Sequence, residues 1–125
     1  MRADHDPLTE VVIGDGIRVH RTLGCGLLES AYEDCLALAL RGRGLEVRQQ
    51  VLLPVEFEGH RIPAAYRIDL LVEGKLIVEI KCVSRILPVH EAQLRTYLRL
   101  SRVKVGLLMN FHVSLLRDGI RRFTM

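Results

Sequence analysis

An acid and a base, Glu79 and Lys81, stand two residues apart in the segment KLIVEIKCV, residues 75–83. Apolar side chains recur at every second position of this segment, a pattern typical of a β-strand. Side chains two residues apart leave the same face of a strand, so the acid and the base would be presented together. A second carboxylate, Asp69, lies in the preceding, largely apolar run, where a buried charge is costly unless it is paired or binds a cation.

This combination of groups suits the hydrolysis of a phosphodiester bond. Attack by water adds negative charge to a phosphorus centre that is already anionic, so cations must meet it. Asp69 and Glu79, with the carbonyl of Ile80 and water molecules, would supply the hard oxygen ligands that Mg²⁺ prefers. Lys81 would stabilise the developing charge or help to orient and deprotonate the attacking water. The alternative is an ordinary surface ion-pair cluster.

The turn between the two strands decides whether the two acids share a face. A two-residue turn at residues 73–74 would pair Asp69 with Val78 and place it on the wrong side of the sheet. The metal hypothesis requires Asp69 to lie beside Glu79, which implies a three-residue loop over residues 73–75 or a bulge nearby. Asp69 and Glu79 on opposite faces would contradict the hypothesis.

The elements that must position these residues follow from hydrophobic periodicity and from the placement of glycine and proline. In order, the predicted elements are helices over 9–22 and 27–41, strands over 47–59, 60–74 and 75–83, a helix from Pro88 to about Leu100, a strand over 103–111, and a final hairpin around Asp118-Gly119. The predicted fold class is α/β (α+β), with a central mixed β-sheet flanked by helices in the order ααβββαββ.

Length and composition predict a small soluble protein. With 125 residues and 49% hydrophobic content, the chain can bury one continuous core, and a single domain over residues 1–125 is expected. No window approaches the roughly 20 apolar residues that cross a bilayer, and no secretory signal is evident. Cys25, Cys35 and Cys82 fit neither a disulfide framework nor a metal pair, so we expect small buried thiols, a cytoplasmic location and no membrane partner.

The charge distribution permits binding to nucleic acid. The net charge is +3 and the isoelectric point is near 9.0, which allows attraction to phosphate backbones. In the last third of the chain only Glu91 and Asp118 oppose the basic residues. These basic residues are Arg85, Arg95, Arg99, Arg102, Lys104, Arg117, Arg121 and Arg122. The asymmetry is compatible with a nucleic-acid surface, although solvated helix faces account for most such charges.

Two short patterns resemble a known group of proteins. Residues 26–32, GLLESAY, match the GxxExxY signature, and Arg67-Ile68-Asp69 with Glu79-Ile80-Lys81 match the split acidic motif of the PD-(D/E)XK nuclease superfamily. The resemblance to the GxxExxY protein family runs from about Val19 to Phe123 and includes residues 106–111. Ile68 stands where the superfamily name has proline.

The resemblance implies a restriction-endonuclease-like core that uses Mg²⁺ or Mn²⁺. It assigns Asp69, Glu79 and Lys81 to the metal and reaction centre and adds Glu29, whose helical spacing places it on a largely inward face. Gln93 and Tyr97 also resemble the QxxxY element of RecB-type nucleases, one helical turn apart and able to face the same cleft. As alternatives, Glu29 would form a salt bridge with an arginine, and the glutamine and tyrosine would only complete a polar network.

These observations support three hypotheses about function. The first is a metal-dependent nuclease that hydrolyses phosphodiester bonds in nucleic acid, with DNA as the favoured substrate. The second is a catalytically silent module that retains the nuclease fold and binds nucleic acid or a protein. The third is a subunit that needs a partner, for which a homodimer is one solution. DNA versus RNA, endonuclease versus exonuclease action, and the pathway stay open.

Overall fold

The computed structural model describes residues 6–125, except for the side chain of Ala64, and residues 1–5 of the predicted domain lie outside this part. The elements are α1 (Pro7–Leu23), α2 (Glu29–Gly42), β1 (Val47–Phe57), β2 (His60–Val72), β3 (Leu76–Lys81), α3 (Pro88–Ser101), β4 (Val105–Asn110), the 3₁₀ helix η1 (Leu116–Gly119) and β5 (Ile120–Thr124). Apart from η1, this is the predicted order ααβββαββ.

The strands form one five-stranded sheet in the order β1-β2-β3-β4-β5. β3 and β4 run parallel, whereas the other neighbouring strands pair antiparallel. The parallel pair requires a crossover connection, which α3 provides. The prediction of a mixed sheet flanked by helices is therefore confirmed.

The hairpin of β2 and β3 has the register that the metal hypothesis requires. Val72 pairs with Leu76 and Leu70 pairs with Val78, so residues 73–75 form a three-residue loop. Glu73 and Gly74 both have positive φ angles, of 55° and 64°, which turn the chain tightly. One further step along the same register places Asp69 beside Glu79, and the predicted loop length is confirmed.

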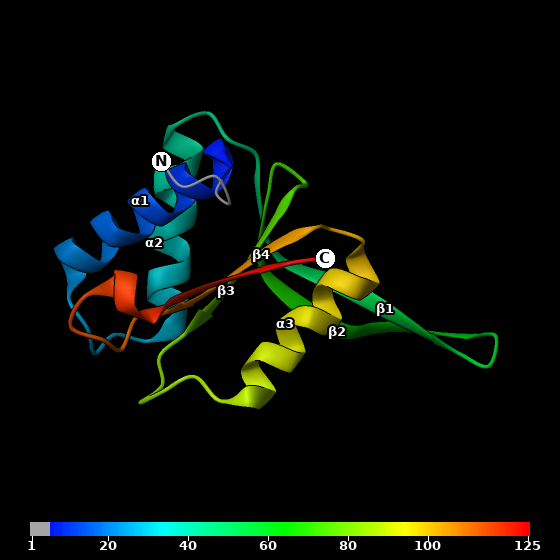
Figure 1. Cartoon of the computed structure of the whole chain (residues 1–125). Coiled ribbons are helices and arrows are strands. Elements are labelled where there is room, and N and C mark those ends of the chain that lie inside the picture. The colour runs from blue at the N-terminus through cyan, green and yellow to red at the C-terminus, as the bar shows by residue number, and fades with distance from the viewer. Residues whose placement is uncertain (1–5) are drawn as a thin grey trace.

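Helices cover both faces of the sheet (Figure 1). On one face, α1 and α2 pack against the strands in a cluster that includes Leu36 and Val78. On the other face, Leu94 of α3 packs against Ile77 in a second cluster. Ile77 and Val78 are both fully buried, so β3 is a central strand covered on both sides. The sequence interpretation had given this strand only one buried face.

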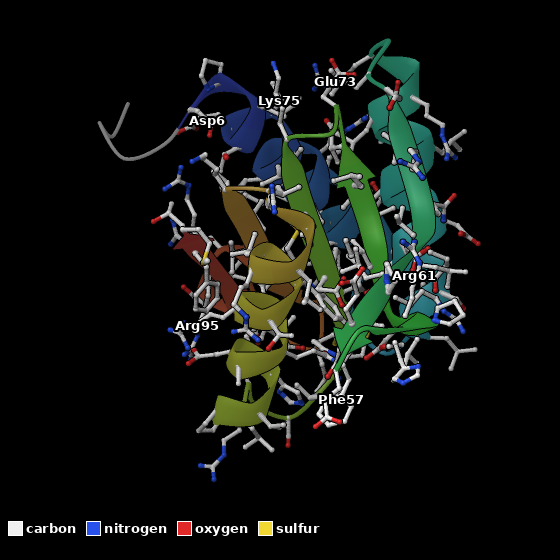
Figure 2. All side chains as sticks on the ribbon, turned by 90° about the vertical axis from the view of Figure 1, so that its right-hand side faces the viewer. Asp6, Phe57, Arg61, Glu73, Lys75 and Arg95 are labelled. Carbon is white, nitrogen blue, oxygen red and sulfur yellow. The ribbon has the colours of Figure 1, made fainter. Side chains whose placement is uncertain are left out.

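The hairpin of β1 and β2 extends beyond the rest of the sheet (Figure 1). β2 pairs with β3 only through residues 70–72, whereas it pairs with β1 as far as His60. Figure 2 shows Phe57 at one end of the molecule, with Glu73 and Lys75 together at the other end. Asp69 therefore stands where β2 leaves β3.

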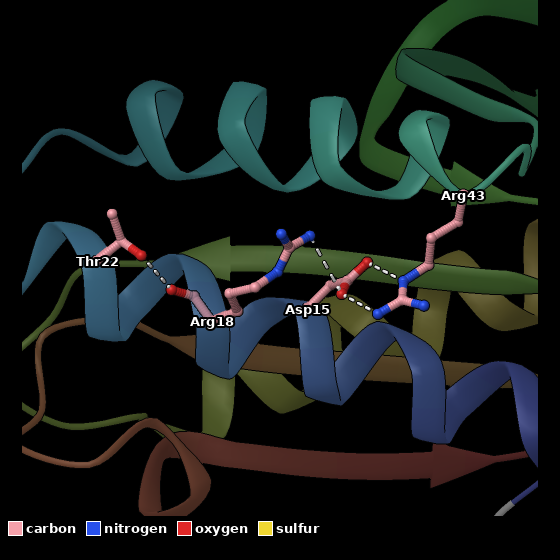
Figure 3. A network of polar contacts seen from close by, with 4 residues as sticks. All are labelled: Asp15, Arg18, Thr22 and Arg43. Atoms are coloured by element: carbon pink, nitrogen blue, oxygen red, sulfur yellow. Dashed lines mark hydrogen bonds and ion pairs between the residues drawn. The ribbon is translucent and has the colours of Figure 1, made fainter.

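A buried ion pair joins the two N-terminal helices (Figure 3). The side chain of Asp15 on α1 is only 1% exposed and accepts two hydrogen bonds from the guanidinium of Arg43, at 2.7 and 2.8 Å. Arg18 lies at 3.5 Å from the same carboxylate. These contacts hold the pKa of Asp15 below its usual value. The pair fixes α1 against the end of α2, and thus helps to position the helix that faces the site.

The predicted first residues of α1 and α2 were each wrong by two residues. α1 begins before the predicted range 9–22 because the carboxylate of Asp6 accepts a hydrogen bond from the amide of Thr9 at 2.7 Å and caps the helix. α2 begins after the start of the predicted range 27–41 because Leu28 is extended, with ψ of 151°.

The predicted strand ends also need correction. The strand expected over 75–83 ends at Lys81, because the amide of Cys82 donates to the carboxylate of Glu29 and not to a neighbouring strand. The strand expected over 103–111 begins only at Val105, because Arg102 adopts a left-handed conformation with φ of 62°.

Two further expectations concern thiols and membranes. Cys25 is exposed, contrary to the expected burial of all three cysteines, because it lies in the turn between α1 and α2, whereas Cys35 and Cys82 are partly buried. Within residues 6–125 the structure contains no helix long and apolar enough to cross a membrane.

Candidate active site

The carboxylates of Asp69 and Glu79 each accept a hydrogen bond from a main-chain amide of the opposite strand, at the point where β2 and β3 separate. The amide of Asp69 donates to Glu79 Oε2 at 2.7 Å, and the amide of Ile80 donates to Asp69 Oδ2 at 2.8 Å. These two hydrogen bonds hold the side chains of Asp69 and Glu79 next to each other, as the sequence predicted.

Burial makes both carboxylates reluctant to ionise. Glu79 is 3% exposed, and burial followed by the neighbouring charge of Asp69 raises its pKa to about 8. Burial also raises the pKa of Asp69, although the hydrogen bond from Ile80 acts in the opposite direction. Two desolvated carboxylates side by side need either a shared proton or a bound cation.

Lys81 extends towards α3 and does not form an ion pair with either acid. Its Nζ lies 3.4 Å from Oε1 of Gln93. The ion pairs found among residues 6–125 do not include Lys81, although its charge favours ionisation of Asp69 and Glu79 and lowers the pKa of both. The alternative of a surface ion-pair cluster is therefore wrong, since Glu79 is buried and the ammonium group stays free to meet an anion.

Glu29 lies at the edge of the acidic pair. Its Oε2 accepts a hydrogen bond from the amide of Cys82 at 3.0 Å, and its charge contributes to the raised pKa of Asp69. The residue itself is exposed, so the predicted inward orientation was wrong. It takes part in none of the ion pairs within the described residues, so the alternative of a salt bridge with an arginine is not realised either.

Glu33, one helical turn after Glu29, is the buried acid of α2. Its two carboxylate oxygens accept hydrogen bonds from Gln50 at 2.7 Å and from Gln49 at 2.8 Å. Burial raises its pKa, and the charge of Asp69 adds to this rise. Sequence reasoning missed this residue, although residues four apart share a helix face and the spacing from Glu29 could have indicated it.

Gln50 on β1 connects Glu33 to Asp69. It lies opposite Asp69 in the register of β1 and β2, and its Nε2 is 3.4 Å from Asp69 Oδ1. Its φ of 55° is unusual for a residue other than glycine inside a strand. Sequence reasoning missed Gln50 as well.

Two residues of α3, Gln93 and Tyr97, interact with residues of β3. Gln93 accepts from Lys81, as described above, and Tyr97 is 4% exposed. Burial and the charge of Glu79 raise the pKa of Tyr97 to about 12, so its hydroxyl stays protonated near Glu79. Its ring also meets Tyr66 edge-on, with 5.7 Å between centroids. Gln93 therefore contacts Lys81, and Tyr97 lies close enough to Glu79 and Asp69 for their charges to raise its pKa.

The donor set fits a Mg²⁺ ion held by few protein ligands. Mg²⁺ commonly binds one or two carboxylates and keeps several waters or substrate oxygens. Asp69 and Glu79 provide two carboxylates, and none of the ion pairs found among residues 6–125 joins either of them to an arginine. Residues 6–125 contain no group of three or more acidic, histidine or cysteine side chains gathered closely enough to hold a metal. The predicted convergence of Glu29 with the other two acids into one such group is therefore wrong, because its carboxylate is held by Cys82.

Comparison with known proteins agrees with this geometry. The model of the PD-(D/E)XK nuclease superfamily matches residues 6–123. Among solved structures, the crystal structure of SSO0001 is similar over 96% of this chain and 78% of that chain, with a TM-score of 0.50 and 18% identity, a likeness that concerns the fold alone. A comparison with curated proteins gives no match. The predicted restriction-endonuclease-like core is confirmed, whereas the narrower resemblance to the GxxExxY family stays a prediction.

Proposed function

The chain belongs to the PD-(D/E)XK nuclease superfamily, and from this premise we propose that it is a Mg²⁺- or Mn²⁺-dependent nuclease that hydrolyses phosphodiester bonds, with DNA as its substrate. The observation that carries the proposal is the reciprocal bonding of Asp69 and Glu79, each of whose carboxylates accepts a main-chain amide of the neighbouring strand. Burial raises the pKa of both, which gives a divalent cation a reason to bind there.

Asp69, Glu79 and the carbonyl of Ile80 would hold the ion, with Glu29 at the edge of the site. The amide of Ile80 points to Asp69, and in a paired strand residue the carbonyl points the same way. A bound divalent cation supplies positive charge to the phosphate and lowers the pKa of a bound water. Glu29 is not among these ligands, because its carboxylate already accepts a hydrogen bond from the amide of Cys82.

The groups of β3 and α3 would act on the substrate. Lys81 takes part in none of the ion pairs found within residues 6–125, so its ammonium group would bind the phosphate and stabilise its developing negative charge. Gln93 orients this ammonium group by accepting from it. Tyr97 stays protonated, because burial and the charge of Glu79 raise its pKa to about 12, and its hydroxyl would donate to an oxygen near the acids.

A cleavage assay tests the proposal. Purified protein is incubated with single-stranded, double-stranded and supercoiled DNA, and with RNA, in Mg²⁺, in Mn²⁺ and in EDTA. We expect metal-dependent cleavage of DNA that falls by at least about 100-fold in Asp69→Asn and Lys81→Met. Lys75→Met is the matched control, because Lys75 is an exposed lysine at the far end of β3, and it should retain activity. Equal cleavage by all variants would assign the activity to a contaminant and contradict the proposal.

One observation favours the alternative of a silent module that binds nucleic acid. Within the described residues the acids do not gather into a three-ligand group, and Glu29 is bonded to a main-chain amide. If this alternative holds, the protein should bind DNA in a salt-dependent manner without cutting it, and Asp69→Asn should leave the affinity for DNA unchanged. This pattern would support the alternative, because phosphate contacts depend on lysine and arginine and not on carboxylates.

A further inference from the structure

Gln50 adopts a backbone conformation that a strand does not require. Its φ of 55° lies in the left-handed region, while its neighbours Gln49 and Val51 keep their register with Leu70 and Ile68. A side chain other than glycine makes this conformation unfavourable, and such residues persist where surrounding contacts impose them. The unusual conformation occurs directly opposite Asp69.

The contacts of the Gln50 side chain explain what this conformation achieves. One amide nitrogen, Nε2, donates to Glu33 Oε1 at 2.7 Å and lies 3.4 Å from Asp69 Oδ1. Glu33 is 7% exposed and is bonded through its other oxygen to Gln49, so it provides a fixed support on α2. The Gln50 amide therefore lies between two carboxylates and offers one N–H to each.

We propose that Gln50 is a positioning residue that holds the carboxylate of Asp69 in its metal-binding orientation. The inference rests on the proposed function, because it concerns the same metal site. Oδ2 of Asp69 is bonded to Ile80, and the Gln50 amide restrains Oδ1 from the other side. The amide also separates Asp69 from Glu33, whose charges repel each other. Outer groups that orient a metal ligand typically change metal affinity by about 10- to 100-fold.

Gln50→Gly distinguishes the role of the Gln50 side chain from the role of its backbone conformation. Glycine adopts a φ of 55° without strain, so this variant keeps the turn of the strand and loses only the amide. Gln50→Ala loses the same amide but keeps a Cβ in the unfavourable conformation, so its Tm in EDTA should lie about 3 to 5 °C below that of Gln50→Gly. If the amide positions Asp69, both variants lose metal affinity equally despite this difference in stability.

Gln49→Ala is the matched control. The hydrogen bonds of the Gln49 side chain all join it to α2, at Glu33, Asp34 and Arg41, so its loss weakens the link between α2 and β1. The experiment measures Mn²⁺ binding by calorimetry and Tm in EDTA for the wild type and the three variants. We expect the Kd for Mn²⁺ to rise by about 10-fold in both Gln50 variants and by less than about 3-fold in Gln49→Ala.

Each result distinguishes this inference from the proposed function. Wild-type binding together with unchanged binding by Gln50→Gly overturns the positioning role and leaves the nuclease proposal in place. An equal loss in Gln49→Ala also overturns it, because the effect would then belong to the packing of α2 against β1. Absence of Mn²⁺ binding in the wild type overturns the proposed metal site and this inference with it.

Discussion

Glu79→Gln should stabilise the metal-free protein at alkaline pH. The folded protein holds a proton on Glu79 up to a pKa of about 8, whereas the unfolded chain releases it near 4.5. Between these values the folded state binds more protons, so the free energy of unfolding falls as the pH rises. Glutamine is neutral throughout and can still accept the hydrogen bond from the amide of Asp69, so the variant lacks this loss.

The size of the effect follows from the same two values. A carboxyl whose pKa rises from 4.5 to about 8 on folding weakens the folded state by up to about 5 kcal/mol once it is ionised in both states. The residue is only 3% exposed, so screening by solvent is small, but relaxation of the site and entry of water reduce the cost. We therefore expect the stability of Glu79→Gln relative to the wild type to increase by about 2 to 4 kcal/mol between pH 5 and pH 9.

Urea unfolding in EDTA and reducing agent, followed by circular dichroism at both pH values, measures this difference. Glu56→Gln is the control, because Glu56 is an exposed glutamate on β1, and its stability relative to the wild type should not change with pH. An equal effect of Glu79→Gln at pH 5 and pH 9 would refute the argument. Glu79 would then ionise freely in the folded protein, and its burial would not drive cation binding.

Three further predictions concern α1 and α2, the helices that pack together on one face of the sheet. Arg43→Ala should lower the free energy of unfolding at pH 7, because it leaves the buried carboxylate of Asp15 without its main partner. Arg43 lowers the pKa of Asp15 in the folded protein below 3.8. The stabilisation by this ion pair is therefore present above pH 3.8 and is lost as the pH falls through the pKa of Asp15 in the folded state. Urea unfolding of the wild type and the variant at pH 7 and near pH 3 would show this loss. Gly14→Ala should raise stability by about 0.5 to 1 kcal/mol, because Gly14 is exposed in a helix interior with open space around it. Gly16→Ala, on the same helix, should not give this gain, because the added Cβ collides with the end of the Met109 side chain and crowds Leu116 at 3.3 Å. A Gly16→Ala protein stabilised as much as Gly14→Ala would contradict this packing.

The order of the elements and the pairing of the acids could be predicted from the sequence. Hydrophobic periodicity depends on which side chains a helix or strand buries, and it gave all eight predicted elements in the correct order. The register of β2 and β3 followed from chemistry, because Asp69 lies beside Glu79 only with a three-residue loop or a bulge nearby, and the structure has the loop. Helix and strand ends were less predictable, since Asp6 and Cys82 set them through side-chain contacts.

Gln50 could not be found by the same reasoning, and Glu33 was overlooked although its spacing from Glu29 could have indicated it. A left-handed glutamine in a strand breaks the preference of its residue type, and nothing local in the sequence marks it. It is imposed by contacts with two carboxylates from other elements. For α2, the motif spacing directed attention to Glu29, while the approach of β1 buries Glu33 instead. Both omissions arise from tertiary contacts between segments far apart in the chain.

Titration of the protein with Mn²⁺, monitored by electron paramagnetic resonance, tests the central claim most directly. If Asp69 and Glu79 form a cation site, the wild type binds one ion per chain, and Asp69→Asn weakens this binding by at least about 10-fold without lowering Tm in EDTA. Failure of the wild type to bind at millimolar Mn²⁺, or equal binding by Asp69→Asn, would contradict the account.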